Sequence, residues 1–253
     1  MMEHNPTHTI APTPATDDGA APPSNAVRSL VARAVREFGL IAPGDRVAVG
    51  ISGGKDSLLL FSALRDLQRR QDLSFELTAV HLDQHQPGFA RATFDHSLAA
   101  LGIDCAIASE DTWSVVSSKL EPGQIPCALC SRMRRGVLNQ WCQARGINKL
   151  ALGHHLDDAI ETFFLNLLYG RRLDPLKPAT PSERTGVTTI RPLILVEEAK
   201  VVAWVAAHDV AVVPCPVCDS FPESRRRDLK QLITGFRALH PQVGASVRTA
   251  LYG

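Results

Sequence analysis

The segment at positions 52–57, Ser-Gly-Gly-Lys-Asp-Ser, combines residue types that can bind a phosphate group. Its two glycines allow backbone angles that a Cβ atom forbids, so the chain can wrap closely around a ligand. A predicted buried strand at residues 47–51 precedes the segment, and a helical pattern follows it. The N–H groups and the dipole at a helix start favour an anion, and the lysine adds a positive charge. The pattern therefore predicts a phosphate-binding loop.

Two common phosphate-binding motifs do not fit this loop. A Walker loop aligned on Lys55 needs glycine at position 49 and serine or threonine at position 56, but the sequence has Val49 and Asp56. The dinucleotide fingerprint Gly-x-Gly-x-x-Gly fails as well. The hexapeptide instead resembles the signature of the PP-loop ATP pyrophosphatases, which cleave ATP between its α and β phosphates. That resemblance implies a loop that holds the departing pyrophosphate, with Asp56 helping to place Mg²⁺.

A second group of reactive residues consists of two Cys-x-x-Cys pairs, Cys127 with Cys130 and Cys215 with Cys218. This spacing fits a four-thiolate zinc site or an iron–sulfur cluster held by three or four thiolates. Some 85 residues separate the pairs, which slightly disfavours a compact zinc ribbon. A redox pair is a further alternative, although the thioredoxin-type context is absent. Spacing alone does not choose between zinc and iron.

Polar clusters also follow two other predicted strands. Residues 153–158, Gly-His-His-Leu-Asp-Asp, come after the strand at 149–152, and a polar loop at 83–89 comes after the strand at 77–82, which carries His81. In open α/β sheets, ligands bind beyond the carboxyl ends of the strands. The loop at 83–89 is thus placed to meet the adenosine of ATP, and His154 or Asp158 to lie near ATP or Mg²⁺. The alternatives are an ordinary polar loop and a helix cap formed by Asp157 or Asp158.

The elements that must position these clusters alternate between strand and helix. Further strands are expected at 105–109, 188–192 and 211–213, with a loop at 170–186. Such alternation predicts an α/β fold with an open, mainly parallel sheet and helices on both faces. Residues 1–23 are rich in Pro, Thr, Ala and Asp and are expected to be a disordered tail. Residues 24–253 are expected to form a single domain with a helical C-terminal part.

Composition limits the partners and the compartment. The net charge is +1, so any binding of nucleic acid must come from local clusters rather than from a global field. No apolar run reaches the length of a membrane span and no secretory signal is evident, so we expect a cytoplasmic protein without membrane contact. The candidate RNA-binding clusters, which could equally be solvated helix faces, are Arg132, Arg134 and Arg135, and Arg225, Arg226 and Arg227.

Taken together, the motifs resemble those of the tRNA 2-thiocytidine synthetase family, over about residues 26–250. The resemblance rests on the hexapeptide and on the segments at 82–89, 127–136, 151–158, 190–193 and 214–218. It implies that ATP adenylates the C2 oxygen of cytidine 32 in tRNA and that sulfur then replaces it. It further implies a [4Fe–4S] cluster, with sulfur supplied by a donor such as a cysteine desulfurase. A homodimer is one option for the assembly.

The resemblance also assigns roles to particular residues. It implies catalytic roles for Lys55, Asp56 and Asp158, and cluster ligation by Cys127, Cys130 and Cys218, with Cys215 as the weaker candidate for the third ligand. The residues expected to bind the nucleotide are Ser52, Gly53, Gly54, Lys55, Asp56, Ser57, His81, Gly153 and His154. The remaining alternatives are a tRNA 2-thiouridine synthetase, a lysidine-type enzyme, a small-molecule pyrophosphatase-ligase and a zinc-stapled nucleotide-binding protein without thiolation activity.

Overall fold

A computed structural model describes residues 21–70, 73–120, 126–215 and 225–253, with Arg225 and Arg226 described by their backbone alone. The predicted tail lies outside this description except for residues 21–23, and Cys218 lies outside it as well. The first described residue already contacts the rest of the protein: the Ala21 carbonyl accepts a hydrogen bond of 3.3 Å from the Trp204 indole N–H.

The helices and strands follow one another in the alternation that the sequence predicts. The strands are β1 (Arg46–Gly50), β2 (Glu76–Asp83), β3 (Cys105–Ser109), β4 (Lys149–Ala151), β5 (Ala179–Pro181) and β6 (Thr188–Ile190). The helices are α1 (Asn25–Glu37), α2 (Lys55–Arg69), α3 (Arg91–Ala100), α4 (Thr112–Ser118), α5 (Cys127–Gln143), α6 (Leu156–Leu168), α7 (Glu198–Ala207), α8 (Arg225–Leu239) and α9 (Val243–Tyr252). Local signals fix several boundaries; for example, Ser24 accepts from Val27 N–H to cap α1.

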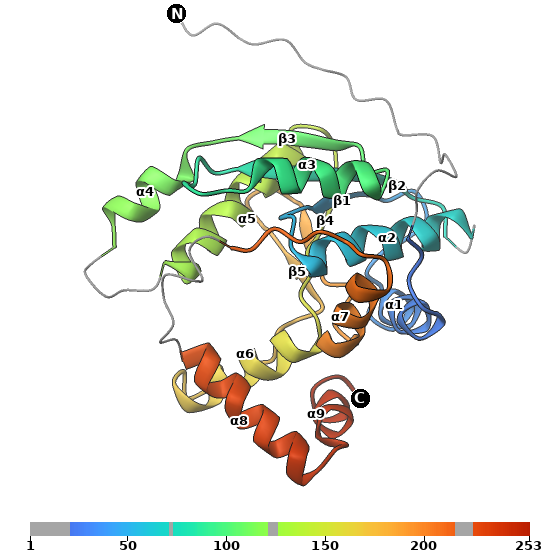
Figure 1. The fold of residues 1–253 in the computed structure, drawn as a ribbon, viewed down its shortest axis with the longest axis vertical. Helices are drawn as coiled ribbons and strands as arrows, with labels where there is room; N and C mark the ends of the chain where they lie inside the picture. The colour runs from blue at the N-terminus through green and yellow to red at the C-terminus, as the bar shows by residue number, and fades with distance from the viewer. Residues whose placement is uncertain (1–20, 71–72, 121–125, 216–224) are drawn as a thin grey trace, which may run out of the picture.

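In the described part of the chain the strands form a six-stranded sheet in the order β3-β2-β1-β4-β6-β5. All neighbours are parallel except β5, which runs antiparallel to β6. The predicted fold class is thus confirmed. The carboxyl ends of β1, β2, β4 and β6 lie at one edge of the sheet, and the segments that follow them meet there (Figure 1).

Helices cover both faces of the sheet because side chains alternate along its strands. Val47 and Val49 of β1 point into a core shared with α1, α2, α3 and α7. Ala48, between them, points to the other face, where it packs in a cluster with Leu138 and Cys142 of α5. The central strand is therefore buried on both sides, and the loop that follows it has a rigid base.

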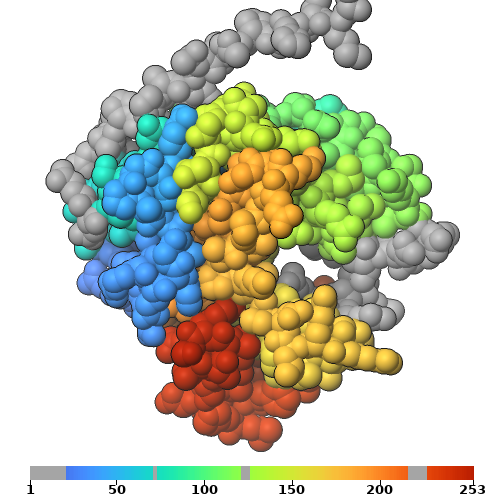
Figure 2. Space-filling view, turned by 180° about the vertical axis from the view of Figure 1, so that it is seen from behind, coloured from blue at the N-terminus to red at the C-terminus, as the bar shows by residue number. Residues whose placement is uncertain are grey.

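A C-terminal helical layer lies beyond the sheet. Leu156 and Ile160 of α6 pack with Ile233 of α8 in a separate apolar cluster. Figure 2 shows the C-terminal helices in red below the blue N-terminal part and beside the gold segment that follows α6. Helix α7 packs against α2, the helix that follows β1, and so lies between α2 and this C-terminal layer (Figure 1).

Two local predictions were wrong, and one helix was missed. Residues 170–186, expected to be a loop, contain the short edge strand β5, whose pairing depends on its neighbour β6 rather than on a pattern of its own. Residues 211–213 were expected to be a strand but do not belong to the sheet. Individual hydrogen bonds hold them: Val213 N–H donates to the Gly53 carbonyl, and the Ala211 carbonyl accepts from the Ser97 hydroxyl. Helix α4 was not predicted. None of the helices in the described ranges is long and apolar enough to cross a bilayer.

Candidate active site

The loop at residues 51–54 turns directly from β1 into α2. The Ser57 hydroxyl donates to the Gly54 carbonyl at 2.9 Å and accepts from Ser52 N–H at 3.2 Å. The Ser52 hydroxyl accepts from Gly54 N–H at 3.3 Å. These bonds fix the bend and place the start of α2, with the N–H groups of Lys55 and Asp56, at the carboxyl edge of the sheet. The loop therefore has the predicted strand–turn–helix form, and phosphate binding by these residues stays a prediction.

Two glycines let the chain pack against this bend. Gly53 has a φ of +81°, and a Cβ atom there would lie 2.8 Å from Val213 Cγ2 and 2.9 Å from Phe94 Cδ2. A Cβ atom on Gly153, at the end of β4, would lie 2.9 Å from the carbonyl carbon of Asp56 and 3.0 Å from Ser57 N. The strand next to β1 therefore meets the start of α2 backbone to backbone, which explains why both positions need glycine.

The charged side chains at the start of α2 interact with one another and with α7. The Lys55 ammonium donates to both oxygens of Asp56, at 3.0 and 3.1 Å, and lies 3.2 Å from Glu198 Oε1. Burial alone would lower the pKa of Lys55, but the two carboxylates outweigh burial and raise it. Burial raises the pKa of Asp56, against the opposing charges of Lys55 and His155. Lys55 therefore keeps its charge over the neutral pH range.

The turn between β4 and α6 places three more polar side chains beside the loop. His155 Nδ1 accepts from Asp158 N–H at 3.3 Å while Asp158 Oδ2 accepts from His155 N–H at 3.1 Å, so the two residues cap α6 reciprocally. His155 Nε2 lies 3.6 Å from Asp56 Oδ1. Asp158 thus caps the helix, which is one of the two alternatives from the sequence, and its contact with ATP or Mg²⁺ stays a prediction. His154, half-buried, belongs to the same turn.

The predicted nucleotide residue His81 lies beneath the loop. It is 6% exposed, and its Nδ1 is 2.8 Å from the Ile51 carbonyl. Its ring packs against Phe89 and Phe94, with centroids 5.0 and 4.4 Å away. Burial lowers its pKa. These contacts support the backbone just before the bend, and direct contact of His81 with the nucleotide stays a prediction.

The first cysteine pair lies in the first turn of α5. Helix α5 begins at Cys127, because Cys130 N–H already donates to the Pro126 carbonyl at 2.9 Å. A spacing of three residues places both thiols on one side of the first turn, where the helix dipole favours thiolates. The Cys130 thiol lies 3.4 Å from the side-chain oxygen of Gln84, just beyond β2. The pair therefore lies at the same edge of the sheet as the phosphate-binding loop.

Cys215, the described member of the second pair, follows the segment that runs from α7 to this edge. Val213 N–H donates to the Gly53 carbonyl at 3.0 Å, which ties the segment to the bend two residues before Cys215. Burial raises the pKa of Cys130, and the charge of Cys215 adds to this effect, so the two thiols are electrostatic neighbours. One segment thus connects the loop with the thiols at the start of α5.

The described donor set suits an iron–sulfur cluster in its chemistry but is incomplete. Soft thiolates are the ligands that iron–sulfur clusters and zinc prefer. Among the described residues, no group of three His, Cys, Asp or Glu side chains is arranged to hold a metal ion. Cys127 and Cys130 fit as two of the three predicted ligands, and the third, Cys218, lies outside the described residues. The ligand set therefore stays a prediction.

Sequence reasoning missed the roles of Glu198, Lys230 and Arg237, which form ion pairs around the site. Glu198 of α7 pairs with Lys55 and also with Lys230 of α8, whose ammonium lies 2.7 Å from Glu198 Oε2. Asp157 accepts from Glu198 N–H at 2.7 Å and pairs with Arg237 at 2.7 Å. No motif marks these residues, because each partner is far away in the sequence.

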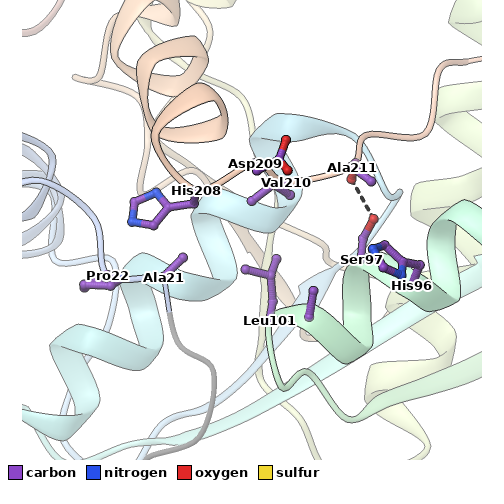
Figure 3. A pocket seen from close by; sticks show the side chains of 10 residues that line it. Ala21, Pro22, His96, Ser97, Leu101, His208, Asp209, Val210 and Ala211 are labelled. Atoms are coloured by element: carbon purple, nitrogen blue, oxygen red, sulfur yellow. Dashed lines mark hydrogen bonds between the residues drawn. The ribbon is translucent and has the colours of Figure 1, made fainter.

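A separate cavity of about 270 Å³ lies between α3 and the segment after α7. Figure 3 shows His208 and His96 at opposite ends of it, and the hydrogen bond from Ser97 to the Ala211 carbonyl along one side. None of the predicted site residues lines this cavity. It is therefore distinct from the edge where the loop and the cysteines meet.

Comparison with known proteins supports the same assignment of motifs. Residues 25–214 match the family described as the PP-loop domain. The chain is 39% identical over 237 residues to the tRNA-cytidine(32) 2-sulfurtransferase of Deinococcus radiodurans, covering 92% of this chain and 79% of that protein. It is 42% identical over 203 residues to the enzyme of the same name from Xanthomonas axonopodis pv. citri, covering 80% and 67%.

A solved structure shares the fold. The U34-tRNA thiolase NcsA from Methanococcus maripaludis, determined with its [4Fe–4S] cluster, superposes with a TM-score of 0.68 at 21% identity. The match covers 89% of this chain and 77% of that one. At 21% sequence identity, this similarity shows that the two proteins share a fold and nothing further.

Proposed function

Because the chain belongs to the PP-loop family of tRNA-cytidine(32) 2-sulfurtransferases, we propose that it uses ATP to replace the C2 oxygen of cytidine 32 in tRNA with sulfur. One observation carries the proposal at the level of the site. The bend at Gly53 bonds to the segment that leads to Cys215, and Cys130 contacts the end of β2, so the loop and the thiols face one edge. Activation of a base and delivery of sulfur require such proximity.

The first step is adenylation of the base. The cytosine C2 oxygen attacks the α-phosphorus of ATP, the bond to the β-phosphate oxygen breaks, and pyrophosphate leaves. Lys55 and the N–H groups at the start of α2 stabilise the charge that develops on pyrophosphate. We assign to Asp56 and Asp158 the orientation of Mg²⁺ and the reacting groups. The oxygen of C2 then departs as part of AMP when sulfur attacks the carbon.

The thiols serve the second step. We assign Cys127, Cys130 and Cys218 as ligands of a [4Fe–4S] cluster, with Cys215 as the alternative third ligand. When bound by three thiolates, such a cluster supplies one iron without a protein ligand, which can hold exogenous sulfur. The chain's own part is to hold this group beside the loop and to receive an extruded base, as an anticodon-loop nucleotide allows.

The partners follow from this chemistry. The substrate is tRNA, and the sulfur comes from a donor such as a cysteine desulfurase persulfide, with a thiol reductant supplying the two electrons that bring the outer sulfur to the sulfide level before it replaces the C2 oxygen. The nature of both partners supports a cytoplasmic location. A homodimer is one option for the assembly, and the mass of the protein in solution tests it separately from the activity.

The function is tested by mass spectrometry of tRNA nucleosides from a strain that lacks the gene. We expect 2-thiocytidine to disappear and other thiolated nucleosides to stay at normal levels. The wild-type gene and a Cys142→Ala variant should restore 2-thiocytidine, since Cys142 is buried against the sheet. Cys127→Ser should not restore it, and the anaerobically purified variant should be colourless.

Contrary outcomes are equally clear. Normal 2-thiocytidine in the deletion strain refutes the proposal. Loss of a 2-thiouridine instead of 2-thiocytidine would show that the target base is a uridine. A zinc-containing, colourless wild-type protein that does not restore thiolation supports the alternative of a zinc-stapled nucleotide-binding protein.

A further inference from the structure

We propose that Glu198 is a positioning residue that orients the Lys55 ammonium for the departing pyrophosphate and couples the phosphate-binding loop to the C-terminal helices. This inference rests on the proposed function and deepens it. It starts from the contacts of Glu198, which is the first residue of α7. One carboxylate oxygen lies 3.2 Å from Lys55 Nζ, and the other lies 2.7 Å from Lys230 Nζ of α8.

Glu198 is held so that its carboxylate has little freedom. Its backbone N–H donates to Asp157 Oδ2 at 2.7 Å, which caps the start of α7 from the neighbouring helix α6. Asp157 is 5% exposed, and its other oxygen pairs with Arg237 at 2.7 Å. Lys230 and Arg237 lie seven residues apart, two turns of α8, and so project from one side of that helix. Two ion pairs from one helix thus fix Glu198 and its neighbour Asp157.

Lys55 needs such an orienting partner because its side chain is long and flexible. A lysine carries its charge on four methylene groups and loses much rotamer freedom when it is fixed. Asp56 alone does not fix it, because Asp56 is the next residue on the same helix and moves with it. Glu198 approaches from another element, so the ammonium has partners on two sides. The Lys55 charge is thereby held at the mouth of the loop before ATP arrives.

The arrangement predicts a separation of effects on rate and on affinity. Glu198→Gln keeps the size of the side chain but removes the charge that attracts Lys55. We expect pyrophosphate release at saturating ATP to fall by about tenfold to a hundredfold, since small misplacements of a catalytic group cost that much. We expect KM for ATP to change less than about threefold, because removal of a negative charge near the phosphates offsets the poorer orientation.

Glu197 offers a matched control on the adjacent position. Its carboxylate pairs with Lys200 at 2.8 Å within α7. Glu197→Gln therefore breaks a lysine–glutamate pair of the same helix without touching Lys55, and its rate should match wild type. Glu198→Asp keeps the charge on a shorter side chain and should recover part of the rate. It also serves as the test variant if Glu198→Gln unfolds at a lower temperature than wild type.

A double-mutant cycle with Lys55→Met separates positioning from general damage. In the Lys55→Met background, Glu198→Gln should lower the rate by less than about twofold, because the residue it orients is gone. An equal loss in both backgrounds overturns the inference, and so does a Glu198→Gln enzyme with the wild-type rate.

Binding of inorganic pyrophosphate, measured without tRNA, keeps this inference apart from the proposed function. Glu198→Gln should change the pyrophosphate affinity at least about threefold when Lys55 is present, and not in the Lys55→Met protein. If wild type releases no pyrophosphate with tRNA but shows this coupling, the thiolation proposal fails and the role of Glu198 stands. If the coupling is absent from a wild type that thiolates tRNA, only the role of Glu198 fails.

Discussion

At the scale of single residues, the site depends on two positions that carry no Cβ atom. At Gly53 and Gly153 a Cβ atom would lie within 3.0 Å of neighbouring heavy atoms. At Gly153 the nearest of these atoms belong to the backbone of Asp56 and Ser57, which cannot rotate away as a flexible side chain could. The segment after β4 can therefore approach the start of α2 this closely only because position 153 is glycine.

Gly153→Ala should displace the start of α2. Overpacking against backbone costs about 1–3 kcal/mol, so we expect a lower unfolding free energy together with weaker ATP binding. Gly235→Ala is the control, because that glycine lies in α8 and a Cβ atom there would meet no atom beyond its own helix within 4 Å. Alanine at this position should stabilise the helix by up to about 1 kcal/mol. Urea unfolding and ATP titration measure both effects, and wild-type ATP affinity in Gly153→Ala would contradict the steric account.

The cysteines also differ from one another at this scale. Burial raises the pKa of Cys105 to about 12 and that of Cys142 to about 12, so both thiols stay protonated at neutral pH. Cys130 is less buried, and the charge of Arg134 opposes the rise of its pKa. Because a metal ligand must be a thiolate, Cys130 is a better ligand than the more deeply buried Cys105 and Cys142. Cys105 and Cys142 instead pack in apolar clusters on the two faces of the sheet.

At the scale of elements, α7 and α8 are joined to the loop by charge. Burial would raise the pKa of Glu198, but the hydrogen bond and charge of Lys230 and the charge of Lys55 lower it to about 2. A carboxyl group whose pKa is lower in the folded state than in the unfolded state stabilises the fold above its unfolded pKa. That contribution disappears as the pH falls through the folded pKa.

The stability difference between wild type and Glu198→Gln should therefore depend on pH in a defined window. We expect wild type to be the more stable at neutral pH and the difference to shrink as the pH falls from about 4.5 to about 2. Urea unfolding of both proteins across this window measures it. A difference that stays constant down to the acid end would mean that the Glu198 charge does not stabilise the docking of α8.

At the scale of the whole molecule, a nearly neutral protein must bind a polyanion through local charge. Arg132 is exposed on α5, and Arg134 and Arg135 lie on the same helix as the cysteine pair. The charge of Arg135 also acts on Arg191 at the end of β6, and burial together with Arg135 lowers the pKa of Arg191 to about 10. Positive charge thus gathers at the edge of the sheet where we propose that the base enters.

Replacement of one of these arginines should weaken tRNA binding in a salt-dependent way. We expect Arg132→Gln to reduce the slope of log K against log salt by about 1, as for the loss of one phosphate contact. Arg33→Gln is the control, because Arg33 pairs with Glu37 at 2.8 Å on α1, a helix that Figure 1 shows away from α5. Filter binding over a range of salt concentrations measures both slopes, and equal slopes for Arg132→Gln and wild type would remove α5 from the binding surface.

Most of the fold could be predicted from the order of its elements. Alternating strands and helices permit few topologies, and a parallel sheet with right-handed crossover connections is the usual outcome. The errors fell on β5 and on residues 211–213, whose states depend on a neighbouring strand and on the bend at Gly53. Short segments carry little periodicity, so their partners decide their conformation.

The sequence by itself determined the chemistry of the phosphate-binding loop and the proximity of the Cys127 and Cys130 thiols, because both arise from residues that are close together along the chain. It also determined the family to which these motifs belong. Only the tertiary structure decided that Glu198 pairs with Lys55, that Asp157 pairs with Arg237, and that Val213 joins the Gly53 bend. The reason is physical: local conformation follows from neighbouring residues, whereas an ion pair between distant segments forms only after packing has brought them together.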